Sequence, residues 1–186
     1  MASTYTDLGL ELMLTGENSG TWGDKTNKNL ELIQQGFAGY QEVSIAGGAQ
    51  TTALAMTDAT LSNARNAVIK FTGTITGNQI VTIPDSIEKA YTIINGTSGA
   101  FTVQFKTVSG SGFTFSTTDK GTRLVYSNGT DVVDVNALFT TINQFTLPSS
   151  DGTSGQAIVT NGSGTLSFAD AGISTGKAIA MAIVFG

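Results

Sequence analysis

The sequence predicts a mainly β protein, an antiparallel β-sandwich or barrel module with a short N-terminal helix and a C-terminal hairpin and strand extension. Between Ile80 and Val135, apolar residues recur two apart within short runs, which is the period of a half-buried strand. These runs are separated by segments rich in Gly, Asn, Ser and Thr, which tolerate positive φ or hydrogen-bond their own backbone. Because the segments have the length of hairpin loops, we expect consecutive strands to pair antiparallel.

The strands of this module follow one another closely. The residues that alternate within them are Tyr91 and Ile93, then Phe101, Val103 and Phe105, then Phe113 and Phe115, then Leu124 and Tyr126, then Val133 and Val135. The turn segments that separate them are residues 95–99, 109–112, 117–121 and 127–130. Further strands are expected at residues 41–45, 51–56 and 67–72, and another at residues 79–83 where the module begins. We take residues 41–140 as one β-rich central domain.

Residues 1–40 are expected to form an N-terminal attachment segment with one helix. The helix is predicted over residues 25–37, with Asp24 placed to cap its first turn and Gly36 or Gly39 to end it. Its apolar stripe consists of Leu30, Ile33 and Phe37. The stripe is too narrow to form an independent core, so the helix must dock on another surface.

Trp22 is the only tryptophan and stands where the preceding loop enters the helix. One interpretation is a packing anchor at this junction. The alternative is a stacking site for a sugar ring or a partner protein, since an indole offers both an apolar face and an N–H donor.

Residues 141–186 are expected to contain a hairpin and an apolar terminal strand. Short strands at residues 156–160 and 165–168 flank the turn residues Asn161 and Gly162. At the end of the chain, bulky residues at every second position alternate with small or branched apolar ones; the bulky ones are Ile179, Met181, Ile183 and Phe185. A strand that is apolar on both faces is an aggregation site if exposed, so we expect it to be buried or paired with another chain.

Composition excludes several functions. Charged residues make up 12% of the chain and the net charge is −5, with no cluster of Lys and Arg, so we expect no nucleic-acid partner. The chain has no cysteine and no histidine, which removes thiol nucleophiles, imidazole bases and the usual zinc ligands. No run of apolar residues approaches the roughly 18 needed for a membrane span.

The motifs that carry chemistry in other proteins are weak in this one. Asp131 and Asp134 lie three apart near a turn, so they are not expected to act as a catalytic pair, and the Asn and Asp residues around them match no strong calcium-loop signature. The sequons at Asn95, Asn128 and Asn161 fit hairpin turns better than glycosylation. Residues 172–178 lack the spacing of a phosphate-binding loop. We therefore predict no enzymatic activity, no cofactor and no metal site.

Three stretches of the sequence resemble tail-fibre and related virion proteins of marine tailed bacteriophages, particularly those of cyanobacteria. The first runs from Glu17 through Ile33 and contains Gly20-Thr21-Trp22-Gly23-Asp24, the second runs from Lys89 through Val133, and the third comprises residues 147–152 and 174–182. The resemblance covers most of the chain, but its motifs are turn and packing motifs. They support membership in a virion better than a position within it.

The resemblance implies a structural protein that oligomerises, commonly as a trimer, with one end fixed to the particle and with other virion proteins of the tail or head as partners. Its location is then the virion, assembled in the host cytoplasm. The residues expected to form the assembly interface are Trp22, Leu30, Ile33, Phe37, Ile179, Met181, Ile183 and Phe185. Two alternatives stay open: a capsid-decorating head protein, and a carbohydrate-binding module that recognises a glycan on the host surface.

Overall fold

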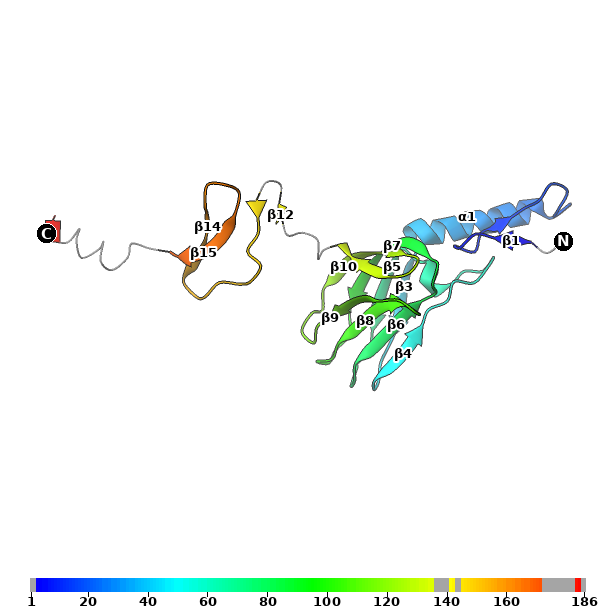
Figure 1. Ribbon diagram of the computed structural model, residues 1–186. Coiled ribbons are helices and arrows are strands. Elements are labelled where there is room, and N and C mark those ends of the chain that lie inside the picture. The colour runs from blue at the N-terminus through cyan, green and yellow to red at the C-terminus, as the bar shows by residue number, and fades with distance from the viewer. Residues whose placement is uncertain (1–2, 136–140, 143–144, 172–182, 185–186) are drawn as a thin grey trace. The chain divides into compact units, whose positions relative to one another are not determined.

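The computed structural model describes residues 3–135, 141–142, 145–171 and 183–184, and within these residues the protein is mainly β (Figure 1). The predicted fold class, a β-sandwich with a helix near the N-terminus, is confirmed. The chain divides into two compact units, Met1–Asn136 and Ala137–Gly186. The N-terminal helix belongs to the same unit as the two large sheets.

The helix α1 spans Trp22–Ala38 and is three residues longer at its N-terminal end than the sequence predicts. Thr21 stands at the N-cap without a side-chain capping hydrogen bond, and Asp24 lies inside the first turn, so the predicted cap at Asp24 is wrong. The helix ends at Gly39 as predicted, and the Gly39 N–H donates to the Gln35 carbonyl at 3.0 Å.

Two sheets form the body of the first unit (Figure 1). The five-stranded sheet has the order β11-β10-β7-β5-β3, and the four-stranded sheet has the order β4-β6-β8-β9. Their strands are β3 (Tyr40–Ser44), β4 (Gln50–Ala53), β5 (Val68–Thr72), β6 (Gln79–Ile83), β7 (Glu88–Asn95), β8 (Val103–Thr107), β9 (Gly112–Phe115), β10 (Thr122–Asn128) and β11 (Val132–Asp134). A small hairpin of β1 (Thr4–Tyr5) and β2 (Glu11–Leu12) precedes the helix, and a 3-10 turn, η1 (Asn63–Arg65), precedes β5.

Successive strands alternate between the two sheets, so the first three strands of each sheet run parallel. The ladder β3-β5-β7 is parallel, and so is the ladder β4-β6-β8. The chain therefore coils three times around the core before β9, β10 and β11 close the unit with antiparallel pairs. The predicted hairpins at residues 109–112 and 127–130 are confirmed. Those at residues 95–99 and 117–121 are wrong, because both segments cross from one sheet to the other.

Glycine corners explain these crossings. Gly47, Gly73 and Gly99 each lie between a strand of the five-stranded sheet and the next strand of the four-stranded sheet, with φ of +110°, +104° and +101°. Only glycine adopts such angles without strain. The corners also bond to one another, since the Gly47 N–H donates to the Thr74 carbonyl at 3.0 Å and the Ile75 N–H donates to the Ser98 carbonyl at 2.9 Å.

The core lies between the two sheets and is made by the inward residues of each alternating strand. Ile69, Phe71, Tyr91 and Ile93 face it from the five-stranded sheet, and residues of β6 and β8 face it from the other. The Phe105 ring lies 5.7 Å from the Tyr91 ring and 6.0 Å from the Phe71 ring, centroid to centroid. These contacts fix the register, because a slip by one residue would turn each inward side chain to solvent.

The second unit contains a hairpin of β14 (Gln156–Thr160) and β15 (Leu166–Asp170), which confirms the hairpin predicted there, and the short pair β12 (Thr141–Ile142) and β13 (Phe145–Thr146). Of the predicted terminal strand, Ile183 and Val184 are described. Both are exposed and helical, so the strand is wrong at these two positions. Ile179, Met181 and Phe185 lie outside the described residues.

Candidate assembly surface and adjoining pocket

The inner face of α1 is fixed by Glu11 on β2. The Asn29 side chain accepts a hydrogen bond from the Glu11 N–H and donates one to the Glu11 carbonyl, both at 2.9 Å. The Glu11 carboxylate pairs with Lys25 at 2.9 Å and accepts a hydrogen bond from the Ser3 hydroxyl. The hydrogen bond from Lys25 is the main reason why the pKa of Glu11 is lowered. Glu11 therefore ties the N-terminal hairpin to the helix.

Arg65, on η1, connects the other end of the helix to two loops. Its side chain is buried, and its guanidinium donates to the carbonyls of Leu8, Thr57 and Thr60 and to the Gln35 side chain of α1. Burial lowers the pKa of Arg65, but five fixed N–H donors suit a site with several converging carbonyls. A single side chain thus connects the N-terminal loop, the helix and the loop before β5.

The predicted apolar stripe of α1 is exposed. The exposed fractions are 65% for Trp22, 58% for Leu30, 41% for Ile33 and 85% for Phe37. Leu32, which is not part of the predicted stripe, is the helix residue that is buried against the unit. The interpretation of Trp22 as a packing anchor within the chain is therefore wrong, whereas the stripe is available to another molecule.

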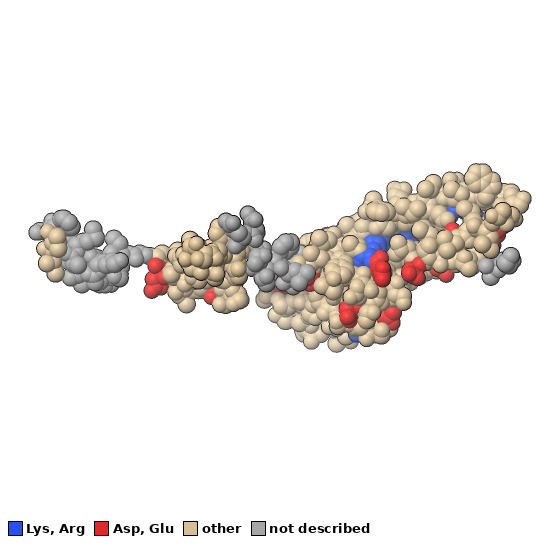
Figure 2. Space-filling model, turned by 45° about the horizontal axis from the view of Figure 1, so that its top comes forward, with Lys and Arg blue, Asp and Glu red and all other residues tan. Residues whose placement is uncertain are grey.

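Apolar and aromatic residues also lie on the outer face of the five-stranded sheet. Tyr40 of β3 and Leu124 and Tyr126 of β10 are all exposed, and Leu124 stands directly opposite Thr92 of β7. Figure 2 shows one face of the molecule, on which charged side chains are scattered within a large uncharged surface. Exposed apolar residues that gather on one surface mark sites where other molecules bind.

Comparisons with protein-family models, with curated proteins and with solved structures each found nothing. The site must therefore be interpreted from its own residues and from the resemblance given above.

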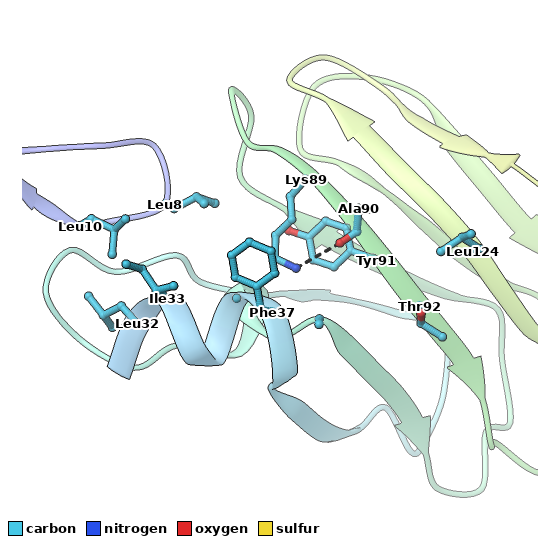
Figure 3. A pocket seen from close by; sticks show the side chains of 12 residues that line it. Leu8, Leu10, Leu32, Ile33, Phe37, Lys89, Ala90, Tyr91, Thr92 and Leu124 are labelled. Carbon is cyan, nitrogen blue, oxygen red and sulfur yellow. Dashed lines mark hydrogen bonds between the residues drawn. The ribbon is translucent and has the colours of Figure 1, made fainter. Parts of the chain in front are cut away.

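A pocket of about 400 Å³ opens between the helix, the N-terminal loop and strands β7 and β10 of the five-stranded sheet (Figure 3). Its lining is almost entirely apolar and includes Leu8, Leu10, Leu32, Ile33, Phe37, Tyr91 and Leu124. Lys89 of β7 is the one charged residue among those that line it. Ile33 and Phe37 belong to both the pocket and the exposed stripe, so the two features adjoin.

The Lys89 ammonium is held by neutral groups. It donates to the carbonyl of Asn66 at 3.2 Å and to that of Ala90 at 3.1 Å, and it lies 4.3 Å from the centroid of the Tyr91 ring. Burial lowers the pKa of Lys89 to about 8. Burial also raises the pKa of Tyr91, whose hydroxyl donates to the Ala64 carbonyl at 3.0 Å.

The other sequence motifs have structural roles where the structure describes them. The side-chain oxygens of Asn95, Asn128 and Asn161 each accept a backbone N–H two residues ahead, which confirms their interpretation as turn residues. Asp131 accepts hydrogen bonds from the Ser111 N–H and hydroxyl, whereas Asp134 lies 3.9 Å from Arg123. Residues 172–178 lie outside the described part of the chain.

The described residues contain neither a metal-binding cluster nor a membrane-spanning helix. No group of three or more Asp and Glu side chains is placed to share a metal ion in this part of the chain. None of the helices that the structure describes is long and apolar enough to cross a lipid bilayer.

Sequence reasoning missed Glu11, Arg65 and Lys89. The residues next to them in the sequence do not show that Glu11 and Arg65 become buried and that Lys89 becomes half-buried. Their burial depends on contacts with segments far away in the sequence, as between Arg65 and Leu8. One feature of the sequence could have identified them: only 12% of the residues are charged, so each charged residue is a candidate for a specific contact.

Proposed function

We propose that the protein is a structural subunit of a bacteriophage virion, a tail-fibre or tail-appendage protein that forms a homotrimer and attaches to other virion proteins. The observation that carries this proposal is the exposed stripe of Trp22, Leu30, Ile33 and Phe37 on a helix whose neighbouring face is fixed to the unit. A chain that leaves these side chains in water gains stability when copies of it associate.

The position of the stripe supports association through α1. Leu30, Ile33 and Phe37 are spaced three and four residues apart, the spacing with which helices pack against one another around a common axis. Lys25 and Asn29, which bind Glu11, precede Ile33 and Phe37 in one row of residues spaced four apart. The exposed side chains of Leu30, Ile33 and Phe37 take no part in the polar contacts with Glu11, so association leaves those contacts in place.

The experiment is the mass of the purified protein in solution by light scattering. We expect a mass near three times the 19.2 kDa of one chain. The double variant Leu30→Glu and Phe37→Glu should fall to the mass of one chain, because it places charges within the stripe. Asn27→Glu, which adds one charge at an exposed position of the same helix outside the stripe, should remain a trimer. A wild-type monomer at every concentration tested would contradict the proposal.

The place in the particle needs a separate test. Antibodies raised against the purified chain, coupled to gold, should label the tails of virions in electron micrographs if the chain is a tail appendage. Labelling of heads would instead favour the capsid-decorating alternative.

The exposure of Trp22 favours one second candidate, a module that binds a glycan on the host surface. An exposed indole can stack on a sugar ring. Binding to a glycan array that is lost in Trp22→Ala, with the oligomeric mass unchanged, would support this function.

A further inference from the structure

The pocket beside α1 combines two features of a small-molecule site. Its volume, about 400 Å³, lies within the range of roughly 300–1,000 Å³ that is typical of such sites. Its walls come from three parts of the unit: Leu8 and Leu10 from the N-terminal loop, Ile33 and Phe37 from α1, and Tyr91 from β7 (Figure 3). An apolar body can therefore lose contact with water on several sides when it enters.

The second feature is the Lys89 ammonium, which has no carboxylate partner among the described residues. No carboxylate of the described residues lies within 4.0 Å of the Lys89 nitrogen, whose hydrogen-bond partners are the carbonyls of Asn66 and Ala90. These carbonyls and the face of the Tyr91 ring offer partial negative charge only. A partly buried ammonium gains most from a full opposite charge, since a charge-assisted hydrogen bond is about twice as strong as a neutral one.

We propose that this pocket binds a free amphiphilic carboxylate of the medium-chain fatty-acid class, with its hydrocarbon chain against Leu10, Ile33 and Phe37 and its carboxylate on the Lys89 ammonium. The apolar lining selects the chain, and Lys89 selects the anionic head. A neutral amphiphile of the same length would bury the same chain but leave Lys89 without its partner. The site requires only the folded first unit, and it shares Ile33 and Phe37 with the proposed contact between copies of the chain.

A glycine in the lining offers a way to fill the pocket. Gly36 lies on the pocket side of α1, and a Cβ at this position would meet no atom within 4 Å. Gly36→Leu should therefore place a side chain in the cavity. It also replaces a helix-interior glycine with a better helix former, so this variant is not expected to unfold.

The test is isothermal titration calorimetry at pH 7 with decanoate, and with 1-decanol as the neutral probe of equal chain length. We expect decanoate to bind, and Lys89→Met to weaken it at least tenfold while 1-decanol binding stays within about twofold. Lys106→Met, which removes a lysine from β8 of the other sheet, should change neither. Gly36→Leu should abolish the binding of both probes.

Three results would overturn the proposal. The first is no detectable heat with decanoate below its micelle concentration. The second is equal affinity for the two probes, unchanged in Lys89→Met, which would make the pocket a nonspecific apolar surface. The third is binding that appears only as the oligomer dissociates on dilution, which would assign the groove to the contact between copies of the chain.

Discussion

Lys89 brings a positive charge into a largely apolar region, and its effect on stability should depend on pH. The pKa of its ammonium is about 8 in the folded chain, below the ordinary value of 10.5, because burial disfavours the charged form. Between these two pH values the unfolded chain holds a proton that the folded chain has released. The free energy of unfolding should therefore gain a contribution that increases with pH from about 8 to 10.

Urea denaturation of the wild type and of Lys89→Met between pH 7 and pH 9.5 measures this effect. The variant should be the more stable of the two at pH 7, and the difference should shrink as the pH rises, because the wild type loses its buried charge. Lys106→Met is the control, because it makes the same substitution at a lysine of the other sheet. A difference that is constant across this range would show that Lys89 keeps its ordinary pKa.

Burial should increase the contribution of a turn asparagine to the free energy of unfolding, as a comparison of Asn95 with Asn128 shows. It is buried, its side-chain oxygen accepts from the Thr97 N–H and hydroxyl, and its amide donates to the Asp119 carbonyl at 2.8 Å. Asn128 makes the same kind of turn at the surface. We expect Asn95→Ala to lower the free energy of unfolding by about 1–3 kcal/mol, since it leaves buried polar groups without partners, and Asn128→Ala by roughly 1 kcal/mol or less. Equal losses in chemical denaturation would contradict this ranking.

The glycine corners make a prediction at the scale of the element. Gly47 and Gly73 occupy equivalent corners with φ of +110° and +104°, but their surroundings differ. A Cβ on Gly47 would meet no atom within 4 Å, whereas a Cβ on Gly73 would lie 2.8 Å from the Cβ of Ala46. Gly47→Ala should cost about 1–3 kcal/mol from backbone strain alone. Gly73→Ala should cost more in thermal or chemical denaturation, and an equal cost would show that the corner relaxes freely.

The corners also show what could be predicted from the sequence and why. The alternation of Tyr91, Ile93, Val103 and Phe105 correctly predicted strands and their buried faces, because a period of two needs only local information. It could not predict which strands pair. A turn of five residues such as 95–99 is long enough to close a hairpin or to cross between sheets, and the choice is made by distant contacts such as that between Ile75 and Ser98.

The candidate assembly surface was predictable to the same extent. Helical spacing identified Leu30, Ile33 and Phe37, and it placed them on one face of α1. It did not show that Leu32, on the neighbouring face, is the side chain that docks the helix. That distinction depends on Glu11 and Arg65, which orient the helix through contacts that have no sequence pattern.

At the scale of the whole molecule, each of the two units contains one of the two surfaces that are predicted to join copies of the chain. The core, both large sheets and the exposed stripe of α1 all lie within Met1–Asn136. The apolar residues Ile179, Met181, Ile183 and Phe185 lie within Ala137–Gly186. A chain that ends at Asn136 keeps every strand pair of the two sheets, so we expect it to unfold cooperatively at a temperature close to that of the corresponding transition in the full chain.

The oligomeric state of this shortened chain then decides between the two surfaces. If the stripe of α1 is the main contact, light scattering should find the trimer in the full chain, in a chain that ends at Lys177 and in the chain that ends at Asn136. If the terminal apolar residues are the main contact, both shortened chains should be monomers while their circular dichroism shows a folded β protein. Loss of the trimer only on shortening from Lys177 to Asn136 would assign the contact to residues 137–177, and would contradict an assembly interface at either of the predicted surfaces.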